Sequence, residues 1–285
     1  MGCDVKDLAP GGGAYGLFTN AQGRILADAV VAALDDHVLV LLPPARGATI
    51  REHLTRFVLA DRVELRSPEA TTALALVGPR TAEVLSAAGA PAPAAEWAAA
   101  RWSASGGEAV VQRLRPCGET AYLIWGAIEE AGAVATRLVG CGARPVGSSA
   151  LEILRVESGF PRFGVDYDEG HFPQETGLEA AVSFTKGCYL GQEVVARIHY
   201  RGHVNRRLCG VVFDRDPGTV EAPRPNEPLL LRGEEVGKLG SVVVSARLGR
   251  TIALAVLRAK AATPGTALAT SSGLAGAVAP LPFVE

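Results

Sequence analysis

Apolar runs separated by turn residues dominate the first 60 residues of the chain. The runs GAYGLFT and RILADAVVAAL flank a turn that contains Asn20 and Gly23, and this order predicts strand, turn and strand. The run VLVLLPP predicts a third strand. In the next segment apolar residues recur at helical spacing, and Thr49 and Glu52 have the spacing of a capping box, so a helix beginning at Thr49 is expected.

Strand-like and helix-like segments alternate between residues 67 and 149. The segments ALALVG, GGEAVVQRLR and ETAYLIWG predict strands, and RTAEVLSAAG and IEEAGAVATRLVGCG predict helices. This order predicts an α+β module similar in size to a ferredoxin-like domain. Ser149 and Glu152 have capping-box spacing at the head of ALEILRVESG, which predicts a further helix.

The pattern changes again after Arg207. Short apolar runs (CGVVF, EPLLL, EVGKLGSVVVS, TIALAVL and TALAT) lie between turns rich in Gly, Pro and Asp. Many short strands of this kind are typical of a small all-β barrel.

The glycine-rich run GGGAYG contains a formal match to the dinucleotide-binding motif GxGxxG. The three motif glycines are Gly11, Gly13 and Gly16, but the run leads into a predicted strand. A dinucleotide site needs these glycines after a strand and at the start of a helix, so we interpret the run as a turn.

Composition narrows the possible classes of function. The chain has 285 residues, 48% of them hydrophobic and 20% charged, which suits a globular protein of two or three modest domains. A net charge of −2 and the absence of a long apolar run give no reason to expect direct DNA binding or a membrane partner. No two cysteines have CxxC spacing, so we expect no metal site and free thiols in a reducing cytoplasm. We also expect a monomer. The cysteines are Cys3, Cys117, Cys141, Cys188 and Cys209.

The segment FTKGCYLGQEVVARIHYRG, residues 184–202, contains the first candidate for chemistry. Its apolar spacing predicts a helix that starts just after Cys188. The helix N-terminus and Lys186 would both favour a thiolate at Cys188, and Gly187 and Gly191 would permit close backbone approach. The alternative is that Cys188 is a small packed residue.

Charged residues nearby give further candidates. The densest basic stretch is either a solvated face, an anion site for carboxylates or a contact for RNA, although no aromatic stacking pattern accompanies it. Asp28 and Glu175 are candidate buried acids, and the alternative for each is an ordinary surface carboxylate. The basic residues are Arg197, His199, Arg201, His203, Arg206 and Arg207.

The run KGCYLGQE resembles the signature of the YgfZ-type folate-binding proteins. The flanks ESGFPRFGVDYDEGHFPQETGL and VARIHYRGHVNRRL and the hairpin LFTNAQGRILADAVV resemble that family as well. These proteins are similar to the T-protein of the glycine cleavage system. The resemblance implies an α+β fold, a three-domain T-protein-like ring with folate in its central channel. Residues 1–66 and 150–205 would form a split first domain, 67–149 an inserted ferredoxin-like domain and 206–285 a C-terminal β-barrel. The family's usual opening strand and helix are expected to be missing at the start.

The resemblance implies a tetrahydrofolate-binding accessory protein for iron–sulfur cluster assembly or repair, including clusters of radical tRNA-modifying enzymes. Its partners would be a reduced folate and iron–sulfur client enzymes. The alternative is an enzyme, a tetrahydrofolate-dependent aminomethyltransferase or demethylase. A thiol-based redox or cluster-ligand protein is a third possibility. T-protein lacks the KGCY signature, which favours the accessory protein.

The same resemblance implies roles for individual residues. Glu175 matches a position that contacts the pterin ring, where its carboxylate accepts hydrogen bonds. Asp28 matches the second of two adjacent acids of T-protein, and Ala27 stands in place of the first. The implied catalytic residues are Asp28, Lys186 and Cys188; the implied cofactor-binding residues are Glu175, Tyr189, Gln192, Glu193, Arg197, Arg201 and Arg206.

Overall fold

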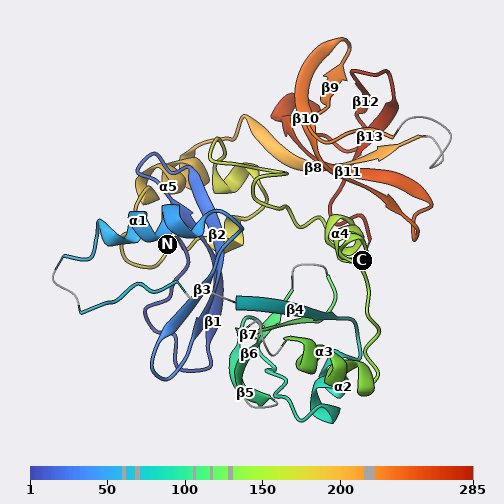
Figure 1. Cartoon of the computed structure of the whole chain (residues 1–285). Helices are drawn as coiled ribbons and strands as arrows, with labels where there is room; N and C mark the ends of the chain where they lie inside the picture. The colour runs from blue at the N-terminus through green and yellow to red at the C-terminus, as the bar shows by residue number, and fades with distance from the viewer. Residues whose placement is uncertain are drawn as a thin grey trace. The chain divides into compact units, whose positions relative to one another are not determined.

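The computed structural model describes residues 1–59, 62–67, 71–104, 107–115, 118–127, 131–214 and 222–284. The chain forms two compact units (Figure 1). The first unit consists of Met1–Gly2, Thr19–Leu26 and Gly147–Glu285, and the second of Cys3–Phe18 and Ala27–Val146. The division into three domains remains a prediction.

A three-stranded sheet opens the chain, as the alternating pattern predicts. Its order is β1-β2-β3, with β1 at Gly13–Thr19, β2 at Ile25–Ala33 and β3 at Val38–Leu41. Burial alternates along the first part of β2, so Ala27 and Ala29 are buried while Asp28 points to the other face. Since β1 starts at Gly13, the run GGGAYG does open a strand, which confirms that it is no dinucleotide motif.

The second sheet belongs to the α+β module. Its antiparallel order is β4-β7-β6-β5, with β4 at Thr71–Val77, β7 at Ala121–Ala127, β6 at Gly107–Leu114 and β5 at Ala99–Ala104. Two helices, α2 (Thr81–Ala87) and α3 (Ala131–Gly140), pack against it. The shared core contains Leu85, Val111, Ile124, Val134 and Leu138.

Both predicted capping boxes are wrong. Helix α1 spans Gly47–Thr55 with Arg46 as its N-cap, and α4 spans Ser148–Glu157 with Gly147 as its N-cap. Neither N-cap makes a side-chain hydrogen bond to its helix. Both helices begin before the predicted caps, so Thr49 and Ser149 already lie inside helices and cannot occupy the N-cap position.

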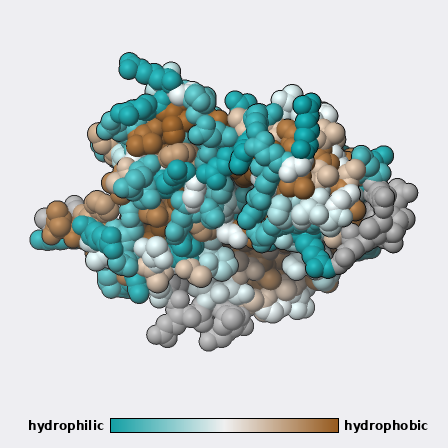
Figure 2. Space-filling view, turned by 90° about the horizontal axis from the view of Figure 1, so that it is seen from above, coloured by the Kyte–Doolittle hydropathy of each residue, from teal (hydrophilic) through white to brown (hydrophobic). Residues whose placement is uncertain are grey.

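Several large hydrophobic side chains are exposed on the second unit. Figure 2 shows hydrophobic residues in separate areas among hydrophilic ones on one face of the molecule. Isolated exposed hydrophobic residues are ordinary at protein surfaces, so we assign no docking role to them. The exposed residues of this unit are Val38, Val40, Phe57, Leu59, Val63, Val139 and Val146.

The C-terminal part forms the predicted barrel. Six strands close in the order β10-β11-β8-β13-β12-β9, so the described sheet has no open edge (Figure 1). Apolar side chains fill its interior, among them Phe213, Leu229 and Leu257. The strands are β8 Arg206–Phe213, β9 Pro228–Leu231, β10 Glu234–Ser245, β11 Arg250–Arg258, β12 Ala267–Thr270 and β13 Ala275–Ala279.

Helix α4 and the long loop after it are anchored to the outside of the barrel. Val156 of α4 packs with Ile252 and Leu254 of β11. Asp166 of the loop is buried, accepts the Ser241 N–H at 2.7 Å and pairs with Arg155 at 3.0 Å. The fully paired carboxylate fixes the loop, which continues through the short 3-10 helices η2 (Pro173–Glu175) and η3 (Glu179–Ala181) to α5 (Gln192–Arg201). A last short helix, η4, spans Ala259–Ala261.

Candidate functional site

The segment KGCYLGQE is docked on the turn between β1 and β2. Gly191, the N-cap of α5, has φ +82°, and a Cβ at this position would lie 2.3 Å from the Asn20 carbonyl oxygen. The Thr19 hydroxyl donates a 2.6 Å hydrogen bond to the Leu190 carbonyl. Gly191 is therefore required for packing and backbone conformation. Gly187 is different, because a Cβ there would meet no atom within 4 Å.

Cys188 is an exposed free thiol just upstream of α5. The helix begins at Gln192, so the prediction that it starts just after Cys188 is wrong. Because helix-terminus effects fall off within the first turn, the helix no longer explains a special chemistry at this thiol. Lys186 donates to the Met1 carbonyl at 3.1 Å and lies 5.6 Å from the centre of the Tyr189 ring.

Two polar atoms near this segment are buried without a hydrogen-bond partner among the residues that the structure describes. They are the Tyr189 hydroxyl and the Gln174 Oε1 atom. The Gln174 Nε2 atom donates to the Val195 carbonyl at 2.8 Å, which anchors η2 to α5. Burial raises the pKa of Tyr189, so its hydroxyl stays a neutral donor. Buried unsatisfied groups are uncommon, and a ligand is one way to satisfy them.

A buried carboxylate, Glu175, lies at the centre of a cluster of basic and backbone groups. Its side chain is only 4% exposed. The Arg206 Nε donates to Oε1 at 3.1 Å, while the Arg206 Nη2 and the Phe172 N–H donate to Oε2 at 3.2 and 3.0 Å. Arg24 lies 3.7 Å from the same carboxylate and 3.7 Å above the Phe172 ring.

This geometry limits what Glu175 can offer to a ligand. A carboxylate has about four acceptor positions, and hydrogen bonds from Arg206 and Phe172 already occupy three of them in Glu175. One position, on Oε1, is left for a further donor. A contact with two pterin N–H groups, as implied by the resemblance, would require Arg206 to give up one of its hydrogen bonds.

The remaining predicted binding residues lie on α5 and are largely solvated. Glu193 and Arg197 pair with each other at 2.8 Å, with both side chains mostly exposed. Gln192 is half-buried and Arg201 is exposed. Of the predicted binding residues, the structure brings Glu175 and Arg206 into direct contact, while the Glu193–Arg197 pair fits an ordinary helix-surface ion pair.

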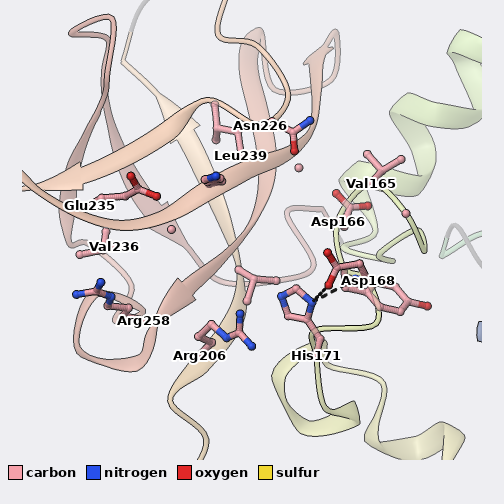
Figure 3. Close-up of a pocket in the computed structure, with 16 residues that line it drawn as sticks. Val165, Asp166, Asp168, His171, Arg206, Asn226, Glu235, Val236, Leu239 and Arg258 are labelled. Carbon is pink, nitrogen blue, oxygen red and sulfur yellow. Dashed lines mark hydrogen bonds and ion pairs between the residues drawn. The ribbon is translucent and has the colours of Figure 1, made fainter. Parts of the chain in front are cut away.

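A polar pocket of about 410 Å³ adjoins Arg206. Residues 164–168 and His171 of the long loop line it, together with residues 235–240 of β10 and Arg258. Figure 3 shows the His171 ring joined to Asp168, with Arg206, Glu235 and Arg258 around the pocket. Charges of both signs in the lining suit a polar ligand.

His171 and Asp168 form a pair at the edge of this pocket. Their Nδ1 and Oδ1 atoms are 2.8 Å apart. Burial opposes ionisation of Asp168, but the Gly170 N–H and the His171 ring outweigh it and hold the pKa of this carboxyl below its ordinary value. An ionised Asp168 can only accept hydrogen bonds, so its carboxylate accepts from the His171 ring when Nδ1 carries the proton.

Asp28, in the second unit, accepts a 2.9 Å hydrogen bond from the Tyr15 hydroxyl. The residues come from β2 and β1, neighbours in one sheet. Sequence reasoning missed Tyr15, although its place in the predicted strand that pairs with the strand of the candidate acid was a usable signal.

Other classes of site find little support in the described ranges. No group of three or more His, Cys, Asp or Glu residues there is arranged to hold a metal ion. The described cysteines are free, and Cys117 lies outside the described residues. Among the helices described, none is long and apolar enough to cross a membrane.

The α+β fold with its C-terminal barrel defines the class of protein. Residues 1–186 match the GCVT N-terminal domain, and residues 206–284 match the glycine cleavage T-protein C-terminal barrel domain. The chain therefore belongs to the glycine cleavage T-protein family, which confirms this part of the resemblance. The narrower YgfZ-type assignment stays a prediction.

Individual relatives agree with this class. An aminomethyltransferase of Thermus thermophilus is 30% identical over 99% of this chain and 79% of its own length. One of Rubrobacter xylanophilus is 28% identical over 98% of this chain and 75% of its own length. The crystal structure of the glycine cleavage system aminomethyltransferase T from Bartonella henselae matches with a TM-score of 0.83 at 25% identity, over 98% of this chain and 78% of that one.

Proposed function

We propose that this chain binds a reduced folate and acts in tetrahydrofolate-dependent aminomethyl transfer. Sequence analysis favoured an accessory protein and kept the transferase as the alternative. Relatives named aminomethyltransferase that align over nearly the whole chain now support the transferase better. The observation that carries the proposal is Glu175, a buried carboxylate held by Arg206 with one acceptor position left for a ligand.

The residues present fit a folate in several respects. The pterin ring presents amino and ring N–H donors, which suit the remaining acceptor position on Glu175 Oε1. The unsatisfied Tyr189 hydroxyl and Gln174 Oε1 add a donor and an acceptor in the same unit. Both are buried, so a ligand that satisfied them would remove the cost of leaving them unpaired.

Asp28 would be the residue that acts on the one-carbon chemistry. Bound tetrahydrofolate supplies the nitrogen atoms that accept a one-carbon unit. The Tyr15 hydroxyl orients the side chain of Asp28, whose carboxylate could stabilise positive charge or accept a proton. Since Ala27 replaces the first acid of the T-protein pair, Asp28 would carry this role without a neighbouring acid.

The folate proposal is tested by titrating the Glu175→Gln variant with tetrahydrofolate in a calorimeter. Glutamine retains an acceptor oxygen but loses the charge, so affinity should fall about 10- to 100-fold, equivalent to about 1.5–3 kcal/mol for a charged hydrogen bond. Glu179→Gln is the matched control, because Glu179 is half-exposed and lies 3.8 Å from His199. Wild-type affinity in a folded Glu175→Gln protein would remove the pterin assignment.

The transfer step needs its own assay. Wild-type protein with tetrahydrofolate and an aminomethyl donor should form methylenetetrahydrofolate and release ammonia together with the donor, whose bond to the aminomethyl carbon is broken and replaced by a bond to hydrogen. Asp28→Asn should bind the folate but lose most of this turnover, by about 100-fold or more, as expected for loss of an acid–base group. Folate binding without any turnover in the wild type would reject the transferase and leave a binding protein.

A second candidate, support of iron–sulfur cluster assembly, rests on Cys188. This thiol is exposed within the KGCYLGQE segment. In cells lacking the native protein, Cys188→Ser should then fail to restore the activity of cluster-dependent enzymes while folding and folate affinity persist. Cys141→Ser is the control. Full rescue by Cys188→Ser at equal protein levels would eliminate this candidate.

A further inference from the structure

Trp97 has a backbone conformation that is unusual for a large side chain. Its φ angle is +65°, in the left-handed region that favours glycine. It lies at a turn just before β5, and its N–H donates to the Arg113 carbonyl at 3.1 Å. Glycine would fit this backbone more easily, so the presence of an indole calls for a reason beyond the turn itself.

Groups from two strands, β6 and β1, hold Trp97 in this conformation. The Gln112 side chain of β6, which is fully buried, donates through Nε2 to the Trp97 carbonyl at 2.9 Å and to the Val31 carbonyl of β2 at 2.8 Å. On β1, a Cβ at Gly13 would lie 2.0 Å from the Trp97 carbonyl oxygen. The strained residue is therefore fixed by its surroundings, as strained residues at functional sites commonly are.

The indole of Trp97 is stacked on the ring of Tyr15. The ring centroids are 5.2 Å apart and the planes are inclined by 19°. The hydroxyl of this same Tyr15 donates to Asp28 Oδ2 at 2.9 Å. Stacking on one ring face restricts how the tyrosine can turn, and so restricts where its hydroxyl can point.

We propose that Trp97 is a positioning residue that orients the Asp28 carboxylate through Tyr15. The chain of contacts runs from Gln112 and Gly13 to Trp97, then to Tyr15 and Asp28, within one compact unit. This inference rests on the proposed function, because the orientation of Asp28 matters only if that acid acts on a ligand. Packed and hydrogen-bonded neighbours of this kind keep a reactive carboxylate in one geometry.

The first test is the crystal structure of the ligand-free Trp97→Gly variant. Glycine relieves the backbone strain and removes only the indole, so the fold should persist. The Tyr15 hydroxyl should move out of hydrogen-bond range of Asp28, from 2.9 Å in the wild type to beyond about 3.5 Å. A Tyr15–Asp28 bond that remains intact would overturn the proposal, whether or not the protein binds folate.

The second test measures turnover in the transfer assay. Tyr15→Phe keeps the stacked ring and removes the hydroxyl, so it should lower turnover about 5- to 10-fold, as for loss of one hydrogen bond. Trp97→Gly should lower turnover by a similar factor, and the variant with both substitutions should lose no more turnover than either single variant. Trp97→Phe keeps an aromatic ring at this position, so it should lose less turnover than Trp97→Gly. Independent effects that multiply in the double variant would mean that Trp97 does not act through Tyr15. Lack of turnover in the wild type would reject the proposed function, while the crystal structures would still decide the positioning role.

Discussion

The two glycines of KGCYLGQE should respond in opposite ways to substitution by alanine. At Gly191 an added Cβ would lie 2.3 Å from the Asn20 carbonyl oxygen and 2.8 Å from the Gly23 Cα, both backbone atoms. At Gly187 it would meet nothing within 4 Å, and φ there is not in the left-handed region. The same chemical change is therefore blocked at one position and free at the other.

The expected cost at Gly191 has three sources. Alanine in the left-handed region costs about 1–2 kcal/mol, and a rigid clash in a packed region costs about 1–3 kcal/mol. Separating the turn from α5 would also weaken the 2.6 Å hydrogen bond from Thr19 to the Leu190 carbonyl, worth about 0.5–1.5 kcal/mol. Since these effects overlap, we expect Gly191→Ala to lower the free energy of unfolding by about 3–5 kcal/mol.

Urea denaturation followed by circular dichroism measures the difference. Gly187→Ala should stay within about 0.5 kcal/mol of the wild type, as for an unhindered surface change. If Gly191→Ala has the same effect as Gly187→Ala, the docking of α5 on the β1–β2 turn is wrong. A loss of folate affinity in Gly191→Ala protein that remains folded would further tie this docking to the proposed site.

Three other predictions concern single side chains. Burial raises the pKa of Cys209 to about 11, whereas Cys188 is exposed. Iodoacetamide at pH 8 should therefore label Cys188 first and leave Cys209 unlabelled in the folded protein. Equal labelling rates of the two thiols would contradict this prediction. Burial opposes ionisation of Glu227, but hydrogen bonds from Ser272 and the Arg224 N–H outweigh it and lower the pKa of the carboxyl from 4.5 to about 2. Because the folded pKa is the lower one, Glu227 stabilises the fold above pH 4.5 and loses this effect as the pH falls towards 2. Glu227→Gln should therefore lower the free energy of unfolding by about 1 kcal/mol at pH 7 and by almost nothing at pH 2. An equal loss at both pH values would contradict this prediction. Asp166→Asn should destabilise the protein by about 2–4 kcal/mol in a thermal melt. The substitution removes the charge that pairs with Arg155 and leaves an uncharged amide facing the Ser241 N–H. A change below about 0.5 kcal/mol would refute the stabilising role of Asp166.

Local patterns in the sequence were sufficient to predict the main elements of the fold. Alternation along β2 and the short runs after Arg207 predicted the opening sheet and the C-terminal barrel, because period-two burial and turn residues are properties of neighbouring residues. The helix starts were predicted less well. The capping boxes at Thr49 and Ser149 and the helix start after Cys188 were wrong, because the packing of the surrounding chain decides where a helix begins.

The sequence also singled out Glu175 and Arg206 without showing that they touch. They are 31 residues apart, and the folded loop after α4 brings them within 3.1 Å. A carboxylate that is nearly fully buried is stable only because Arg206 and the Phe172 N–H satisfy it, and no property of position 175 alone reveals those partners.

Tertiary structure alone identified Tyr15, Trp97 and the different roles of the two glycines. Gly187 and Gly191 look alike in the sequence, and only the position of the Asn20 carbonyl distinguishes them. Trp97 becomes notable only through its left-handed backbone and its stack on Tyr15. The sequence determines periodicity and residue chemistry, which are local, whereas strain, close approach and hydrogen-bond pairing depend on atoms that distant parts of the chain bring together.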